Sequence, residues 1–242
     1  MSGFASVYDK VMAYADYDRW YEFIKSIVEE NGIKGKDVLD LGCGTGEMSI
    51  RFKKSGYAVL GVDISPEMLS IAADKAREKK LDIHFANQDM RELKFPVGFD
   101  IVISLFDTIN YLTSIEEVEE CLESVSDHLD ENGIFIFDMV TENMLDTMFP
   151  GGNFVDDRED MTLVWTREHD EESGIDDIST TFFIKEKSGK YTRFDDYYSK
   201  KVFTVEEIRE SAAKYGFNFF EYIVNSDLAG ERIFCILRKK GE

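Results

Sequence analysis

The residues with the clearest chemical potential form a short run, Val38-Leu-Asp-Leu-Gly-Cys-Gly-Thr-Gly46, in which glycines alternate with other residues after an aspartate. Glycines permit a sharp turn and let a ligand approach the backbone closely. The dinucleotide fingerprint requires a third glycine at position 47, where this chain has Glu47. Asp40, two residues before Gly42, is a poor neighbour for a pyrophosphate but suits a cationic group such as an ammonium. The run therefore predicts a ligand-binding loop that differs from the dinucleotide type.

Two further acids follow predicted strands. Asp63 ends the second strand, 21 residues after Gly42, where an acid can accept hydrogen bonds from ribose hydroxyls. It could instead cap the next helix, but Ser65 suits that role better. Asp89 follows the third strand, where the ligand crevice of an open α/β sheet is expected, although it could also be a simple loop acid.

The elements that must position these residues alternate along the chain. The apolar spacing of residues 16–31 predicts a helix, and the Ser114 capping box predicts another that ends at Asn132-Gly133. This alternation predicts an α/β fold, doubly wound, with a mostly parallel seven-stranded Rossmann-like sheet and an antiparallel last strand. Predicted strands are 37–41, 57–62, 83–86, 99–105, 134–137, 217–224 and 233–237, and further helices cover 47–54, the region after Ser65 and the region after Thr204.

The pattern changes between residues 150 and 203, where side chains alternate with a period of two and Ser188-Gly189 predicts a hairpin turn. We therefore predict a small antiparallel β-meander inserted into the main domain. The expected organisation is an N-terminal helical lid over 1–35, an α/β domain over 36–140 and 204–242, and an inserted β subdomain over 141–203 that covers the substrate.

Three segments together resemble the class I S-adenosylmethionine-dependent methyltransferases in order, wording and spacing. They are Asp40-Leu-Gly-Cys-Gly-Thr-Gly46, Gly61-Val-Asp-Ile-Ser-Pro-Glu-Met68 and Asn87-Gln-Asp-Met90. The resemblance covers residues 36–140, and a weaker similarity extends over 204–238. The layout of the inserted strands resembles one bacterial subgroup of uncharacterised methyltransferases, the YqeM-like proteins.

This resemblance implies the cofactor S-adenosyl-L-methionine and assigns residues to its methionine end. The loop that contains Gly42, Gly44 and Gly46 would cradle the methionine portion. Asp40 would hold the amino group through water, and the carbonyl of Leu105 would face the same group.

The resemblance also assigns residues to the adenosine end. Asp63 would bind the ribose diol, and Ile64 would pack on the adenine ring. Asp89 would accept a hydrogen bond from the adenine amino group, while the backbone amide of Met90 would serve a ring nitrogen.

The substrate side follows the fourth strand, in Phe106-Asp-Thr-Ile-Asn-Tyr111. Enzymes that form N,N-dimethyladenine would have Asn-Pro-Pro-Tyr here, and Asp107 and the absence of Pro-Pro argue against that type. The catalytic candidates on the substrate side are Asp107, Tyr14 and Tyr111. Other polar or aromatic candidates are Tyr8, which could close over the cofactor, and Asn110. Pocket lining and strand packing explain Trp165 and Tyr197-Tyr198 equally well. His169 is expected to be a solvated turn residue.

Composition limits the classes of partner. The chain has 242 residues and a net charge of -21, and such a surface repels the phosphate backbone of a nucleic acid. Its three cysteines, Cys43, Cys121 and Cys235, have no metal-ligand spacing and are expected to be free thiols, so we predict no metal site. No signal peptide or membrane-spanning run is present, which predicts a cytoplasmic protein.

The leading hypothesis is methyl transfer to a small-molecule substrate by in-line displacement, driven by proximity and alignment. Three alternatives stay open at this stage: an oxidoreductase that uses a nicotinamide cofactor, a non-catalytic module that binds S-adenosylmethionine, and a tRNA methyltransferase, which the charge disfavours. The acceptor, its reacting atom and the oligomeric state cannot be read from the sequence.

Overall fold

The computed structural model describes residues 4–239, which form two β-sheets and their helices. The larger sheet has the strand order β10-β11-β5-β4-β1-β2-β3. Strand β11 runs antiparallel to β5 and β10, whereas the pairs among β1 to β5 are parallel, as predicted. The strands are β1 (Asp37–Leu41), β2 (Ala58–Asp63), β3 (His84–Asn87), β4 (Phe99–Ser104), β5 (Leu129–Val140), β10 (Phe219–Asn225) and β11 (Arg232–Arg238).

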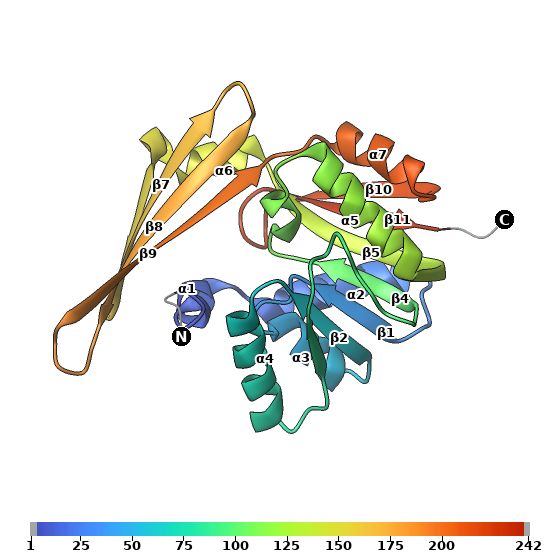
Figure 1. Cartoon of the computed structure of the whole chain (residues 1–242), viewed down its shortest axis with the longest axis horizontal. Coiled ribbons are helices and arrows are strands. Elements are labelled where there is room, and N and C mark those ends of the chain that lie inside the picture. Colours follow the sequence, from blue (N-terminus) through green and yellow to red (C-terminus); the bar gives the residue numbers. More distant parts are fainter. Residues whose placement is uncertain (1–3, 240–242) are drawn as a thin grey trace.

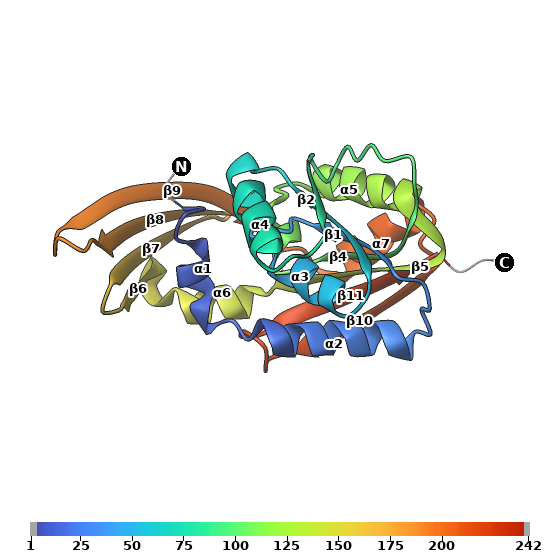
Figure 2. The same ribbon diagram turned by 90° about the horizontal axis from the view of Figure 1, so that it is seen from below.

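Helices cover both faces of this sheet because successive strand residues point to opposite sides. Val38 packs in one hydrophobic core with side chains of α2 and α3, and its neighbour Leu39 packs in another with side chains of α5 and α7. Figure 2 shows α2 and α5 on opposite sides of the sheet. The helices are α2 (Tyr17–Glu30), α3 (Glu47–Lys54), α4 (Pro66–Glu78), α5 (Ile115–His128) and α7 (Val205–Lys214).

The predicted helix starts are present, with one difference. The Ser65 hydroxyl accepts a hydrogen bond from the Met68 amide, and Thr204 forms a complete capping box with Glu207. Ser114 also caps its helix, but the Glu117 carboxylate accepts a hydrogen bond from the Thr113 amide, so only half of the predicted box forms there.

The end of α5 differs from the prediction. The helix stops at His128, and the following residues already belong to β5 instead of continuing to Asn132-Gly133. Leu129 pairs with Phe99 of β4, and the register then shifts before Ile134 pairs with Ile101. Pairing with a distant strand therefore overrides the local signal, and Asn132 takes a positive φ of 66° inside the irregular start of the strand.

The inserted segment forms a second, four-stranded antiparallel sheet, which we call the small sheet. It extends to one side of the larger sheet (Figure 1). The sequence did not identify its first strand or the helix α6 (Glu142–Met148), because both are too short to show a clear period. The strands are β6 (Asn153–Asp157), β7 (Met161–Asp170), β8 (Ile175–Lys185) and β9 (Tyr191–Lys201), preceded by the 3-10 helix η3 (Pro150–Gly152).

Residues at the start of the described part of the chain pack on the small sheet. Val7 and Val11 share a buried core with Leu163 and Phe182 of that sheet and with Leu145 of α6. The segment predicted as one helical lid thus contacts both sheets: its first part packs on the small sheet, and α2 packs on the larger sheet. The elements involved are α1 (Tyr8–Val11) and the 3-10 helix η1 (Met12–Tyr14).

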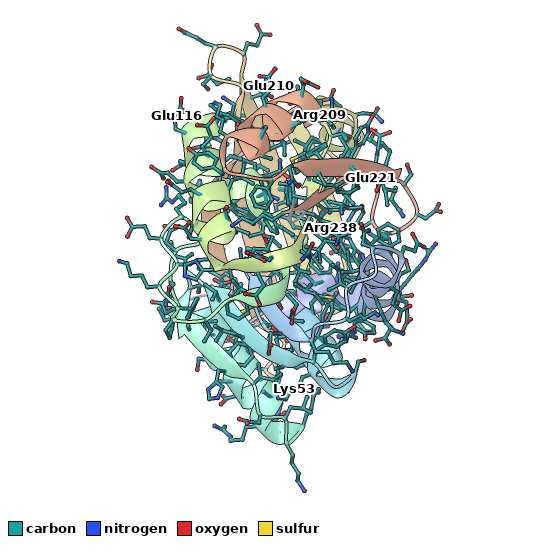
Figure 3. The ribbon with its side chains drawn as sticks, turned by 90° about the vertical axis from the view of Figure 1, so that its right-hand side faces the viewer. Lys53, Glu116, Arg209, Glu210, Glu221 and Arg238 are labelled. Atoms are coloured by element: carbon teal, nitrogen blue, oxygen red, sulfur yellow. The ribbon has the colours of Figure 1, made fainter. Side chains whose placement is uncertain are left out.

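The outer surface is strongly charged. Glu116, Arg209 and Glu210 are exposed on α5 and α7 (Figure 3). Among the helices of residues 4–239, none combines the length and apolar character needed to cross a membrane.

Candidate active site

The glycine loop follows β1 and adopts the backbone that its sequence requires. Gly42, Gly44 and Gly46 have φ angles of 65°, 52° and 80°, in the left-handed region that favours glycine. A Cβ atom on Gly42 would overlap the methyl group of Thr108. Gly46 has a different role: it precedes α3, and a Cβ there would lie 3.0 Å from the Cβ of Ala72, so it allows α3 and α4 to pack closely.

Asp63 connects the glycine loop to the end of β2. Its carboxylate accepts one hydrogen bond from the Gly44 amide at 2.8 Å and another from the Ser65 amide at 2.9 Å. Burial raises the pKa of Asp63, and the backbone donors partly oppose this shift. The carboxylate therefore holds the loop in place and also faces the cavity beside it.

Asp40 is buried beneath the same loop. Its carboxylate accepts a hydrogen bond from the Ser49 hydroxyl, and burial raises its pKa to about 7. Asp40 and Leu105 line a small cavity of about 40 Å³ next to Gly42. The Leu105 carbonyl accepts a hydrogen bond from the Thr108 hydroxyl at 2.8 Å.

A cavity of about 370 Å³, which we call the main cavity because it lies beside the glycine loop, opens at the carboxyl ends of β1, β2 and β3. The structure places most of the predicted cofactor residues on its wall. Gly46 is absent from this wall, and Asp40 and Leu105 line the small neighbouring cavity instead. The predicted cofactor and catalytic residues on the main cavity wall are Gly42, Gly44, Asp63, Ile64, Asp89, Met90 and Tyr111.

Asp89 is engaged by a residue that the sequence did not single out. Arg91 donates hydrogen bonds to both carboxylate oxygens of Asp89, at 3.0 Å and 2.6 Å, and it also pairs with Glu117. The guanidinium group lowers the pKa of Asp89, which is therefore ionised at neutral pH. The Asp89–Arg91 pair forms one edge of the main cavity.

Asp107, the first substrate-side candidate, lies in a buried ionic cluster. Its carboxylate pairs with Lys200 of β9 and, at 2.7 Å, with Arg232 of β11, and Arg232 also contacts Asp138 of β5 at 2.6 Å. The two cations lower the pKa of Asp107, although burial opposes them, while burial raises the pKa of Asp138 to about 6. Asp107 is thus a stably ionised anchor between the two sheets, and its carboxylate is not free to act as a base.

A second cavity, of about 120 Å³, lies between α1, the small sheet and the ionic cluster. Tyr8, Tyr111 and Tyr198 line both this cavity and the main one. Tyr14 is 63% exposed and lines the second cavity and a third, more open one. Tyrosine side chains therefore line the region where the main cavity and the second cavity adjoin.

The remaining aromatic and polar candidates separate into different environments. Trp165 stacks on Phe154, with ring centroids 5.2 Å apart, and also lines the second cavity, so strand packing and pocket lining both apply. Tyr197 is 77% exposed and lies outside both cavities. His169 is exposed, as predicted, but it lies at the end of β7 instead of in a turn, with its Nδ1 atom 2.8 Å from the carboxylate of the buried Asp176.

Asn110, the last polar candidate, joins three parts of the fold. Its side chain is buried, donates a hydrogen bond to the Lys201 carbonyl at 2.7 Å and accepts one from the Val140 amide at 3.0 Å. It therefore fixes the loop after β4 against β5 and β9. The three free cysteines agree with the sequence prediction.

Several residues of the site were missed because their local patterns are ordinary. Lys200 and Arg232 each lie in a strand that reads as part of an alternating β pattern. The period of two does place Asp196, Tyr198 and Lys200 on one face of β9, but only the tertiary structure shows that this face points toward the cavities.

Comparisons with known proteins identify the family. Residues 38–133 match the family described as methyltransferase domain. The chain is 40% identical over 218 residues to the protein YqeM of Bacillus subtilis (strain 168), which is named as a methyltransferase, and the match covers 89% of this chain and 85% of that protein.

Solved structures are similar over nearly the whole chain. A crystal structure of a S-adenosylmethionine-dependent methyltransferase from Clostridium acetobutylicum ATCC 824 has a TM-score of 0.87 and 28% identity, with 98% of each chain covered. CalS10, an amino pentose methyltransferase from Micromonospora echinaspora bound to S-adenosylmethionine, shares the fold with a TM-score of 0.71 and 21% identity, with 92% of each chain covered. With the glycine loop, the main cavity and the YqeM match together, the chain belongs to the S-adenosylmethionine-dependent methyltransferases, in the family that contains YqeM.

Proposed function

We propose that this methyltransferase acts on a small-molecule acceptor, bound between the main cavity and the small sheet. The observation that carries this proposal is that Tyr111 and Tyr198 line both the main cavity and the second cavity. An acceptor in the second cavity would then meet the predicted cofactor site directly. The amino pentose named for CalS10 supports the same size of acceptor.

The residues present fit S-adenosylmethionine. The left-handed backbone at Gly42 and Gly44 keeps side chains away from the cavity wall, and Asp63 offers a buried carboxylate beside them. Asp40 offers a carboxyl group behind the loop, with a pKa of about 7. In this assignment Asp40 and Leu105 face the amino group of the methionine end, and Asp63 faces the ribose.

The adenine end has its own candidates. Ile64 is 68% exposed and lines the cavity, so its side chain is available to pack on a flat ring. The Asp89 carboxylate can still accept a hydrogen bond from the adenine amino group, because each of its oxygens has two lone pairs and Arg91 uses only part of them. The Met90 amide is proposed as the donor to a ring nitrogen.

S-adenosylmethionine supplies an electrophilic methyl group on a sulfonium centre, so the protein mainly aligns the acceptor and excludes water. Tyr8 of α1, which lies against the glycine loop, and Tyr198 of β9 both line the main cavity. Burial and nearby carboxylates raise the pKa of Tyr111, so its hydroxyl stays protonated and can donate a hydrogen bond to the acceptor. Asp107 is proposed to position Lys200 and the loop that contains Tyr111.

We further propose that 36–140 and 204–242 bind the cofactor, and that 141–203 and the part of 1–35 that precedes α2 cover the acceptor, because α2 itself packs on the larger sheet. The net charge of -21 disfavours a nucleic-acid substrate. The free thiols are consistent with action in the reducing cytoplasm.

The proposal is tested with S-adenosylmethionine that carries a labelled methyl group, incubated with the protein and a metabolite extract free of protein and RNA. We expect label in small-molecule products by mass spectrometry, and stabilisation of the protein by S-adenosylhomocysteine in a thermal-shift assay. Label found only in added tRNA, or stabilisation by NAD but not by S-adenosylhomocysteine, would contradict the proposal.

The raised pKa of Asp40 predicts a pH dependence of cofactor binding. If its ionised form attracts the ammonium group, binding should strengthen as the pH rises through the pKa of about 7. The ionised fraction grows roughly eightfold between pH 6 and pH 7.5, so the affinity for S-adenosylhomocysteine should increase by a similar factor. Calorimetry at both pH values measures this, and Asp40→Asn should flatten the profile. The same rise in the variant would exclude Asp40 as its source.

A further inference from the structure

The carboxylate of Asp196 is the acidic group on the part of the main cavity wall that the small sheet supplies. Strand β9 directs alternate side chains to opposite faces. Asp196 and Tyr198 face the main cavity, whereas the neighbouring Asp195 lies on the outer face, where it accepts hydrogen bonds from Thr181 and Arg193. The two adjacent aspartates thus have different environments in one strand.

Asp196 lacks a counter-charge within residues 4–239. The other acids of the main cavity are compensated, since backbone amides bind Asp63 and Arg91 binds Asp89 and Glu117. No side chain of the described residues donates a hydrogen bond to Asp196, and Arg91 is the only basic residue on the described wall. The backbone of Tyr197 donates a hydrogen bond to Asp196, but the negative charge of this partly buried carboxylate has no counter-charge, a cost that a cationic ligand would remove.

The walls beside Asp196 are aromatic. The rings of Tyr111 and Tyr198 lie with their centroids 5.4 Å apart, and both line the main cavity. These rings already attract one cation, since the Nζ atom of Lys200 lies 4.8 Å from the Tyr111 centroid and 5.4 Å from that of Tyr198. Lys200 is itself neutralised by Asp107, so its charge does not cancel that of Asp196. Aromatic rings next to a carboxylate are the usual surroundings of a bound alkylammonium group.

Asp196 shares the main cavity with the residues of the cofactor side. Gly42, Gly44 and Asp63 line this cavity together with Tyr111 and Asp196. Burial raises the pKa of Tyr111, and the negative charges of Asp107, Asp196 and Asp63 raise it further. A ligand group held by Asp196 would therefore lie in the cavity that we assign to the cofactor.

We propose that the acceptor of this enzyme is an amine, and that Asp196 binds its ammonium form and removes its proton. This inference rests on the proposed function and specifies its substrate class. The proton of the ammonium passes to Asp196, and the freed nitrogen lone pair forms the new N–CH₃ bond. The S–CH₃ bond breaks, its electron pair stays on the sulfur of S-adenosylhomocysteine, and the product leaves as a methylated ammonium ion. The proton on Asp196 is then released to water.

The first test separates the inference from the proposed function. A metabolite extract is divided by cation exchange into a retained, cationic fraction and a flow-through fraction, and each is incubated with methyl-labelled S-adenosylmethionine and the full-length protein. We expect label in the retained fraction. Label only in the flow-through would overturn the amine assignment and leave the proposed function intact, whereas label in neither fraction would contradict the proposed function itself.

Matched variants then test Asp196 directly. Asp196→Asn should lower labelling of the retained fraction by about 100-fold, which is the usual scale for loss of a general base. Asp195→Asn changes the neighbouring residue in the same way and should stay within about twofold of the wild type. The affinity for S-adenosylhomocysteine should be unchanged in both variants. A loss of that affinity in Asp196→Asn would instead make Asp196 a cofactor residue and overturn the inference.

A binding measurement provides a readout that does not depend on turnover. Choline carries a cationic trimethylammonium group, and 3,3-dimethylbutan-1-ol is its neutral analogue of the same shape. With S-adenosylhomocysteine present, ligand-detected NMR should show preferential binding of choline to the wild type and to Asp195→Asn, and no preference in Asp196→Asn. An equal response to the two probes in the wild type, including no binding of either, would overturn the inference, as would a preference that persists in Asp196→Asn.

Discussion

Replacing Asp63 with alanine is expected to weaken the binding of S-adenosylhomocysteine by at least about 100-fold. The change removes the acceptor that we assign to the ribose hydroxyls, and it also frees the Gly44 and Ser65 amides that the carboxylate now holds. Hydrogen bonds to a charged group contribute roughly 1.5–3 kcal/mol each, and the loss of two such bonds corresponds to a factor of about 100 or more in affinity. Isothermal titration calorimetry measures the effect.

Asp74→Ala is the matched control for this prediction. Asp74 lies on α4, where it forms an exposed ion pair with Arg77 and does not line the main cavity. Its replacement should leave the affinity for S-adenosylhomocysteine unchanged. A wild-type affinity in a folded Asp63→Ala protein would rule out the ribose assignment, because no other acid occupies the end of β2.

The second large effect is expected from Arg232→Met, which should destabilise the folded protein by about 3–5 kcal/mol, the usual cost of removing one partner from a buried ion pair. Arg232 neutralises Asp107 and Asp138 together, and all three side chains are buried. Without it, Asp138 keeps no basic partner in the described cluster. Urea unfolding measures the free energy of unfolding of the variant and the wild type.

The destabilisation by Arg232→Met should depend on pH, because it changes the pKa of Asp138. Burial already raises the pKa of Asp138 to about 6, and removal of Arg232 should raise it further. A carboxyl group with a raised pKa in the folded state binds more protons when folded than when unfolded, so its effect on stability becomes more unfavourable as the pH increases through that range. The destabilisation by Arg232→Met should therefore be larger at pH 8 than at pH 5.5.

Arg209→Met serves as the control, since Arg209 is exposed on α7 and pairs only with Glu206 at the surface and with the Phe220 ring. It should cost less than about 1 kcal/mol at either pH. If Arg232→Met were no more harmful than this control, the ionic cluster would not anchor the small sheet to the larger one. A destabilisation of equal size at both pH values would contradict the role given to Asp138.

The sequence by itself determined the cofactor side of the protein, because the signals there are local. The glycines directly follow one apolar run, and Asp63 and the Ser65 cap directly follow the next, with 19 residues between Gly44 and Asp63. Strands with buried faces on both sides also read directly as short apolar runs, which is why β1 and β4 were placed to within one residue of the structure. These elements led from the residues to S-adenosylmethionine and to the reaction class.

Only the tertiary structure decided the acceptor side. Asp107 meets Lys200 from 93 residues away and Arg232 from 125 residues away. The hydrophobic periodicity of the sequence does not predict such pairings. They depend on where β9 leaves the small sheet and on the position of β11 between β5 and β10. The same applies to Asp196, whose alternation with Asp195 fixes two faces of β9 but not which of them meets the cavity. Local sequence therefore specified the methyl donor, and the packing of the two sheets decided what surrounds the acceptor.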